Sequence, residues 1–193
     1  MSVHEVATLR LALFSRSTIA TRVALVLGGT AFLAAMAQIS IPIPGSPVPV
    51  TGQTLAVLLL GTAYGANLGL ITFATYLAIG IAGAPVFTQG THGSSHLFGA
   101  TGGYLVGMLL TSYLVGFLAG RQWDQKIATV IPTMILGNLL TFTVGLIWLH
   151  QYTHQNWAWT FSKGFTPFLL GEVIKIAIAS TALPSVWRFV SHR

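Results

Sequence analysis

Six long runs of apolar residues, separated by short stretches of Gly, Pro and polar residues, account for most of the chain. A transmembrane helix needs about 20 mostly apolar residues, and these runs lack the alternation of membrane β-strands. The pattern therefore predicts an all-α integral membrane protein whose residues 1–193 form a single membrane domain with six transmembrane helices. The helices are expected at about 19–39, 51–65, 67–81, 102–119, 127–148 and 167–187.

The segments between the runs are predicted to be loops. Repeated prolines at positions 42–49 exclude a helix there, and residues 85–98 are rich in Gly, Ser and His. Thr166 followed by Pro167 is typical of an N-cap and the first residue of a helix. The second and third runs are short, so they require tilt or helix ends buried by neighbouring protein.

The composition places most of the chain in lipid. Only 6% of residues are charged, against about 25% in soluble domains. Residues 23–120 contain no Asp, Glu, Lys or Arg. The net charge of +6 is not gathered into a basic patch, so nucleic acid is not an expected partner.

The distribution of Lys and Arg predicts the topology. Seven are expected on one side of the membrane, and Lys163 alone is expected on the other; Lys175 lies within a run. Because positive charge accumulates on the cytoplasmic side, both termini are predicted to be cytoplasmic, in a multi-pass protein of the cell membrane. The seven are Arg10, Arg16, Arg22, Arg121, Lys126, Arg188 and Arg193.

The residues available for chemistry argue against an enzyme. The chain has no Cys, its acids are Glu5, Asp124 and Glu172, and it contains no Gly-x4-Gly-Lys-Ser/Thr phosphate loop. Histidines at i,i+4 spacing, His92 with His96 and His150 with His154, lie in segments expected to be loops. They are interpreted as surface imidazoles, so neither a metal site nor a cofactor is expected.

Glu172 and Lys175 are the most informative pair. Their spacing of three puts them on one face of a helix, and charges inside a membrane must face the protein interior or a wet cavity. Counting from Pro167 at about 1.5 Å per residue, both lie in the outer half of the bilayer. They form either an ion pair that only joins helices or a polar anchor for a ligand that enters from outside.

Two further motifs carry polar candidates, each with a structural alternative. Thr51 and Gln53 either contact a ligand or cap the second helix. Thr101 and Tyr104 open the fourth helix, where Tyr104 could line a pocket, although glycines at every fourth position are also explained by helix packing.

In the first helix, small residues form one stripe that suits close packing against another helix, either of this protein or of a partner. The stripe consists of Ala20, Ala24, Gly28, Ala31 and Ala35.

Five motifs together resemble the BioY family, the biotin-binding substrate (S) components of energy-coupling factor (ECF) transporters. They occur in the family's order over most of the chain, with two departures: Glu172 stands where the family usually has Asp, and Ala100 where it usually has Pro. The first departure keeps the carboxylate and moves it by one methylene. The motifs are Ile39–Pro42, Val48–Leu55, Ala84–Phe87, Gly99–Tyr104 and Pro167–Lys175.

The resemblance implies the ECF S-component fold and high-affinity capture of biotin from the outer side. It also implies an energising module that consists of a transmembrane coupling (T) component and two ATP-binding cassette ATPases. Ala31 and Ala35 would contact the coupling component. The ureido N–H groups of biotin would donate to Glu172, and Lys175 would hold either the ureido carbonyl or the valerate carboxylate. The candidate biotin-binding residues are Glu172, Lys175, Gln53, Thr51, Tyr104 and Thr101.

Three other functions remain as alternatives at this point. A proton-coupled secondary transporter of a small carboxylate solute would use Glu172 as the group that carries the proton. A membrane-embedded enzyme would have only Glu172, Lys175 and the histidines for acid and base chemistry. A nickel- or cobalt-binding component would rest on the histidines alone.

Overall fold

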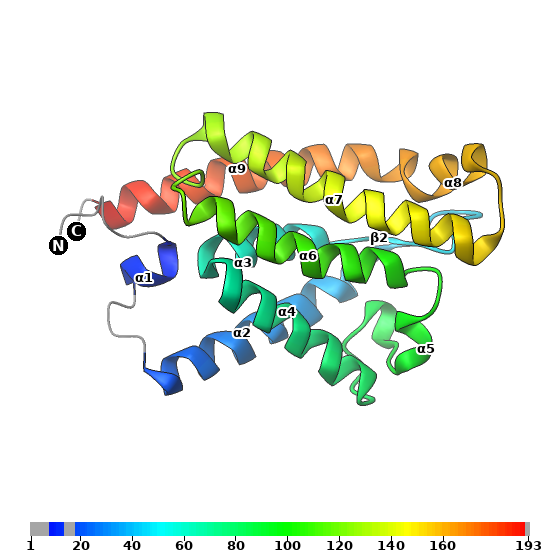
Figure 1. Ribbon diagram of the computed structural model, residues 1–193, viewed down its shortest axis with the longest axis horizontal. Coiled ribbons are helices and arrows are strands. Elements are labelled where there is room, and N and C mark those ends of the chain that lie inside the picture. The colour runs from blue at the N-terminus through cyan, green and yellow to red at the C-terminus, as the bar shows by residue number, and fades with distance from the viewer. Residues whose placement is uncertain (1–7, 14–17, 192–193) are drawn as a thin grey trace.

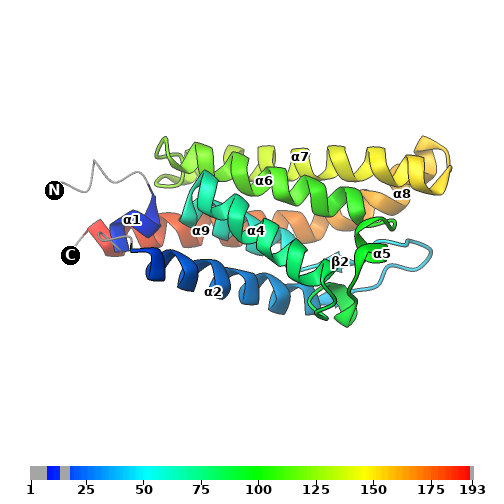
Figure 2. The same cartoon turned by 60° about the horizontal axis from the view of Figure 1, so that its bottom comes forward.

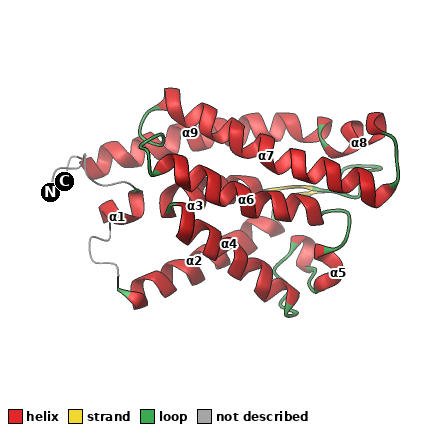
Figure 3. Cartoon of the chain, in the orientation of Figure 1, coloured by secondary structure: helices red, strands yellow, loops and turns green. Residues whose placement is uncertain are grey.

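The computed structural model describes residues 8–13 and 18–191 of the chain. Glu5, Arg16 and Arg193, which entered the sequence predictions, lie outside the described residues. The described chain is mostly helical, with one short antiparallel pair of strands that joins Ser40 to Thr51 and Ile41 to Val50 (Figures 1 and 3).

Helices of very different length follow one another along the chain. Two 3-10 turns, η2 (Thr88–Gly90) and η3 (Thr166–Phe168), and two strands, β1 (Ser40–Ile41) and β2 (Val50–Thr51), lie between them. The α-helices are α1 (Leu9–Leu13), α2 (Ile19–Gln38), α3 (Gln53–Tyr64), α4 (Ala66–Ile81), α5 (Ser94–Leu97), α6 (Gly102–Ala119), α7 (Ile127–Thr153), α8 (Trp157–Gly164) and α9 (Leu169–Ser191).

Each of the six predicted runs corresponds to a helix: α2, α3, α4, α6, α7 and α9. Among the described residues, four helical stretches are long and apolar enough to cross a membrane: α2, α6, α7 and the continuous stretch Trp157–Val190. The shorter α3 and α4 have 12 and 16 residues, or about 18 and 24 Å at 1.5 Å per residue. A multi-pass membrane fold is therefore confirmed, whereas six spans remain a prediction.

Several loop predictions are wrong in detail. The fifth helix extends to Thr153, and the segment after it contains α8, whose N-cap Asn156 accepts a hydrogen bond from the Trp159 N–H at 2.8 Å. Residues 85–98 contain η2 and α5. Thr166 is not an N-cap. It is the first residue of the 3-10 turn η3, which precedes α9 and whose N-cap is Phe165. Such short elements have too few residues to show an apolar period.

Close helix packing explains the glycines that open the fourth predicted helix. A Cβ added at Gly107 of α6 would lie 2.7 Å from the carbonyl oxygen of Thr141 in α7. Gly103 is pressed in the same way against Trp148. The structural reading of this glycine spacing is thus confirmed, and it brings Thr101 and Tyr104 close to α7.

The fold has two distinct ends. The hairpin of β1 and β2, with α5 and α8, lies at one end, and α1, the turn from α6 to α7 and the end of α9 lie at the other (Figures 1 and 2). The core divides in the same way: Tyr104 and Phe168 belong to one cluster of buried residues, and Met134 and Trp187 belong to another. The first cluster adjoins the cavity described next.

Candidate ligand-binding site

A cavity opens among the hairpin, α3, α5, α6, α7 and α9. All six residues selected from the sequence line it: Thr51, Gln53, Thr101, Tyr104, Glu172 and Lys175. The chain thus brings together side chains from segments more than 120 positions apart.

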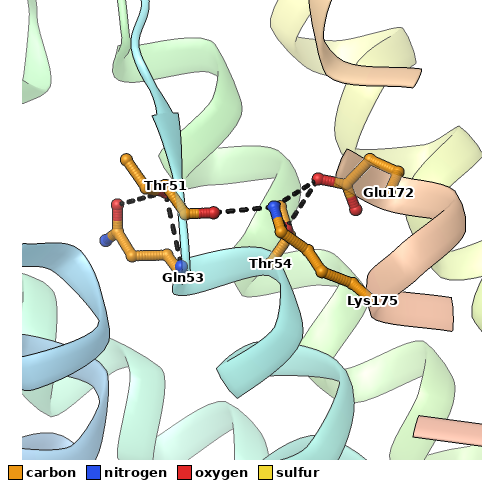
Figure 4. Close-up of polar contacts among 5 residues, drawn as sticks. All are labelled: Thr51, Gln53, Thr54, Glu172 and Lys175. Carbon is orange, nitrogen blue, oxygen red and sulfur yellow. Dashed lines mark hydrogen bonds and ion pairs between the residues drawn. The ribbon is translucent and has the colours of Figure 1, made fainter. Parts of the chain in front are cut away.

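Lys175 is the centre of the charged wall. Its ammonium donates to Glu172 Oε1 at 2.7 Å, to the carbonyl oxygen of Thr51 at 2.7 Å and to Thr54 Oγ1 at 2.8 Å (Figure 4). An ammonium has three hydrogens, and these three acceptors use all of them. Lys175 is therefore fully engaged before any ligand arrives.

Glu172 differs from Lys175 in having spare hydrogen-bonding capacity. Its Oε1 accepts from Lys175 and from the Thr54 hydroxyl at 2.8 Å. Its Oε2 is buried and has no hydrogen-bond partner among the described residues. A buried carboxylate oxygen without a donor is costly, so Glu172 has an unused acceptor in the charged wall.

Gln53 connects the opposite wall. Its amide donates to the Tyr76 hydroxyl at 2.8 Å and accepts from Thr51 Oγ1 and Thr88 Oγ1, each at 3.3 Å. The Tyr76 hydroxyl in turn donates to the carbonyl oxygen of Val86 at 3.1 Å. Thr51 also accepts from the Gln53 backbone N–H at 3.3 Å, so it supports the start of α3 and lines the cavity at once.

Aromatic rings close the apolar side. The Tyr104 hydroxyl donates to the carbonyl oxygen of Gly164 at 2.8 Å. Its ring stacks on Phe168 at 6.2 Å between centroids and meets Phe142 edge to face. With the hydroxyl occupied by the backbone, Tyr104 contributes a fixed ring surface suited to an apolar part of a ligand.

His96 in α5 is a cavity residue that the sequence analysis missed. Its ring stacks on Phe87 with centroids 4.8 Å apart, and its nitrogens lie 3.0 Å from Thr91 Oγ1 and 3.4 Å from Thr101 Oγ1. Burial lowers the pKa of this imidazole. The interpretation of His96 as a surface imidazole is therefore wrong.

The other histidines among the described residues, His92, His150 and His154, do not form a metal site with it. His150 lies within α7 and stacks on Trp157, not in a loop as predicted. Over residues 8–13 and 18–191, no three potential metal-ligating His, Cys, Asp or Glu side chains are grouped together.

The small-residue stripe lies on the outside of the protein. All five members, Ala20, Ala24, Gly28, Ala31 and Ala35, are exposed on α2, which runs along the edge of the bundle (Figure 2). A Cβ added at Gly28 would meet no atom within 4 Å. The stripe is therefore not used for packing within the described chain.

Comparisons with known proteins agree on one family. The model of the BioY family matches residues 7–192. Similar proteins include biotin transporter BioY2 of Lactococcus lactis subsp. cremoris, 37% identical over 85% of this chain and 88% of that protein. Biotin transporter BioY of Thermotoga maritima is 34% identical over 78% of this chain and 86% of its own length.

A solved structure has a similar fold. It is described as the S-component for biotin from an ECF-type ABC transporter, solved by crystallography at 2.1 Å. The two chains superpose with a TM-score of 0.77 and 25% sequence identity, covering 90% of this chain and 94% of the other.

Proposed function

The chain belongs to the BioY family, and we propose that it is the biotin-binding S component of an ECF-type importer. The family assignment makes it a transporter subunit and not an enzyme. The observation that carries the assignment within the site is Glu172 Oε2, a buried carboxylate oxygen without a partner among the described residues, on a side chain that lines the cavity.

Biotin has the complementary groups. One ureido N–H donates to Glu172 Oε2, and the apolar thiophane ring and valerate chain lie against Tyr104 and its aromatic neighbours. Because Lys175 is already saturated, its main role is to orient Glu172. It reaches the ligand only by exchanging Thr51 or Thr54 for a ligand oxygen. Gln53, Thr51 and Thr101 complete the polar wall.

The topology that fits this role places the cavity outward. Arg10, Arg22, Arg121, Lys126 and Arg188 belong to the end of the bundle opposite the cavity, as the placement of their elements indicates (Figure 1). Lys163 lies at the cavity end, where it donates to the carbonyl oxygen of Pro44 at 3.3 Å. By the positive-inside rule, both termini are cytoplasmic, in a single domain of six transmembrane helices in the cell membrane.

The energising partners are a T component and two ATP-binding cassette ATPases. The exposed small-residue stripe of α2 supports a contact with a partner helix, since small residues permit close approach in lipid. Ala31 and Ala35 lie in this stripe and are the proposed contact residues. Nucleic acid is not a proposed partner.

The alternative of a proton-coupled secondary transporter is not favoured. Glu172 is engaged in a 2.7 Å ion pair with Lys175. The family also points to an ECF importer and not to a secondary transporter.

Binding and uptake measurements test the proposal. Protein purified in detergent should release biotin, identified by mass spectrometry, and should rebind it in calorimetry. Cells that contain this chain with an energising module should take up biotin in an ATP-dependent way. Release of a different small molecule, or uptake by the chain alone that collapses with the proton gradient, would contradict the assignment.

A further inference from the structure

One side chain outside the cavity joins the end of α2 to the cavity wall. Gln38 is the last residue of α2 and is not among the residues that line the cavity. Its Nε2 donates to the carbonyl oxygen of Phe87 at 3.0 Å and to that of Ala34 at 3.1 Å. Its Oε1 accepts from the Gly90 N–H at 3.0 Å. The amide therefore contacts both ends of η2, which lies beside the end of α2 (Figure 2).

The backbone of η2 needs such contacts because its conformation is unfavourable. Gln89 has a φ of +58° and Gly90 a φ of +69°. A residue other than glycine rarely stays in this left-handed region unless surrounding contacts fix it. The Gly90 N–H also donates to the carbonyl oxygen of Phe87 at 3.1 Å. Gln38 thus binds both groups of a hydrogen bond that closes the turn.

The η2 turn carries a residue of the cavity wall. Thr88 lines the cavity, is only 7% exposed, and donates its hydroxyl to Gln53 Oε1 at 3.3 Å. It lies between Phe87 and Gly90, the two residues to which Gln38 is bonded. A displacement of the turn would therefore move Thr88 away from Gln53.

The residues on either side of η2 also position His96. The fully buried ring of Phe87 meets Tyr76 edge to face at 5.5 Å and stacks on His96 at 4.8 Å between centroids. Thr91, directly after η2, has its Oγ1 3.0 Å from the Nδ1 of His96. Because His96 lines the cavity, a second wall residue depends on the position of this turn.

We propose that Gln38 is a positioning residue of the ligand site. It does not touch the ligand, but it keeps η2 in the conformation in which Thr88 and His96 complete the cavity wall. Without its hydrogen bonds, η2 spends part of its time displaced, and the apparent affinity falls with the fraction of binding-competent protein. This inference rests on the proposed function, since biotin is the ligand whose affinity reports it.

Two substitutions of Gln38 test its effect on binding. Gln38→Met removes both hydrogen-bonding groups from a side chain of similar length. Gln38→Asn keeps the amide but shortens the side chain by one methylene, which takes it out of hydrogen-bonding distance of η2. Each should weaken biotin binding, measured by calorimetry, by about threefold to tenfold, as expected for the net loss of a hydrogen bond. Gln151→Met, at an exposed position of α7 outside the cavity, should bind like the wild type.

Hydrogen exchange supplies a local measurement that a general loss of stability would not reproduce. Backbone amides of residues 86–92, followed by mass spectrometry, should exchange faster in both Gln38 variants, because η2 opens more often. Exchange in α6, which has no hydrogen bond to Gln38, should stay as in the wild type. A variant that is only less stable would exchange faster in both segments.

The outcomes separate this proposal from the proposed function. Wild-type biotin affinity in both folded Gln38 variants would overturn it, as would weaker binding with unchanged exchange over residues 86–92 or with faster exchange in α6 as well. If Gln38→Met does not fold, Gln38→Asn carries both measurements. If the wild type itself does not bind biotin, the proposed function fails, and unchanged exchange over residues 86–92 would then show that Gln38 does not hold η2.

Discussion

At the scale of single residues, Lys175 and Glu172 in the charged wall of the cavity differ in their remaining hydrogen-bonding capacity. Lys175 has no hydrogen left to donate, whereas Glu172 has a free oxygen. We therefore expect Glu172 to be the group that contacts the ligand and Lys175 to be the group that pairs with the acid. A buried ion pair adds little stability by itself, which is consistent with a pair kept for binding.

The different roles of Glu172 and Lys175 predict the effect of substitutions at these positions. Glu172→Gln and Lys175→Met should each weaken biotin binding, measured by calorimetry, by roughly 1.5–3 kcal/mol, the value of a charge-assisted hydrogen bond. The double variant should lose less than the sum, because each single change leaves a buried charge unpaired. Lys126→Met, far from the cavity, is the control.

The opposite result would identify a purely structural pair. In that case, both single variants bind biotin like the wild type and lose only thermal stability. The ion pair would then join helices without contacting the ligand.

The sequence was informative about this site for a physical reason. Charged side chains in an apolar helix must face the protein interior or a wet cavity. Glu172 and Lys175 could therefore be selected from the sequence, and both line the cavity. Thr54, Tyr76 and His96 were missed because hydroxyls and imidazoles in apolar surroundings are common. Only the three-dimensional contacts show that Thr54 bridges the pair and that His96 faces inward.

At the scale of elements, the loop between α6 and α7 is fastened to the last helix. Trp187 of α9 donates its indole N–H to Asp124 Oδ2 at 2.6 Å, and Asp124 is fully buried with its Oδ1 unpartnered in the described chain. Burial raises the pKa of Asp124 from 3.8 to about 6, although the bonds from Trp187 and the backbone oppose the shift.

Stability should therefore fall as the pH rises. Because the pKa is higher in the folded state, the protonated carboxyl favours folding; this contribution is complete below pH 3.8 and is lost as the pH passes about 6. The loss is at most about 3 kcal/mol. Thermal unfolding of wild type and Asp124→Asn between pH 4 and 8 checks this.

The amide variant should lack that decline and should be the more stable protein at pH 8. An amide keeps the acceptor for Trp187 without a buried charge. If wild type and Asp124→Asn show the same pH dependence over this range, Asp124 is not the group that titrates.

Element prediction succeeded for the six apolar runs and failed for the short elements between them. The ends of α6 agree with the prediction at both residues, since Gly102 and Ala119 adjoin clear polar punctuation. The hairpin and η2 are held by tertiary hydrogen bonds: Lys175 donates to the carbonyl oxygen of Thr51 at 2.7 Å, and the Gly90 N–H donates to Gln38 Oε1 at 3.0 Å. Contacts between distant segments leave no local pattern in a sequence.

At the scale of the whole molecule, the two ends differ in charge, and by the positive-inside rule this difference predicts the orientation in the membrane. Because the chain has no Cys, single introduced cysteines report sidedness without background. Ser94→Cys, exposed in α5, should react with an impermeant maleimide from outside intact cells, and Gln125→Cys should react only after permeabilisation. The reverse pattern would place the biotin cavity on the cytoplasmic side.

The exposed stripe of α2 is the proposed contact with the T component. Ala31→Trp and Ala35→Trp place a bulky ring on an exposed face and touch no cavity residue, so biotin binding by the purified chain should stay within about twofold of wild type. The same ring prevents the close helix approach that small residues permit, so co-purification with the T component and ATP-dependent uptake should be lost. Val23→Trp, 51% exposed on α2 outside the stripe, should keep all three activities. If the alanine variants lose biotin binding as well as the complex with the T component, α2 supports the fold at Ala31 and Ala35. If both variants keep uptake, the stripe faces lipid.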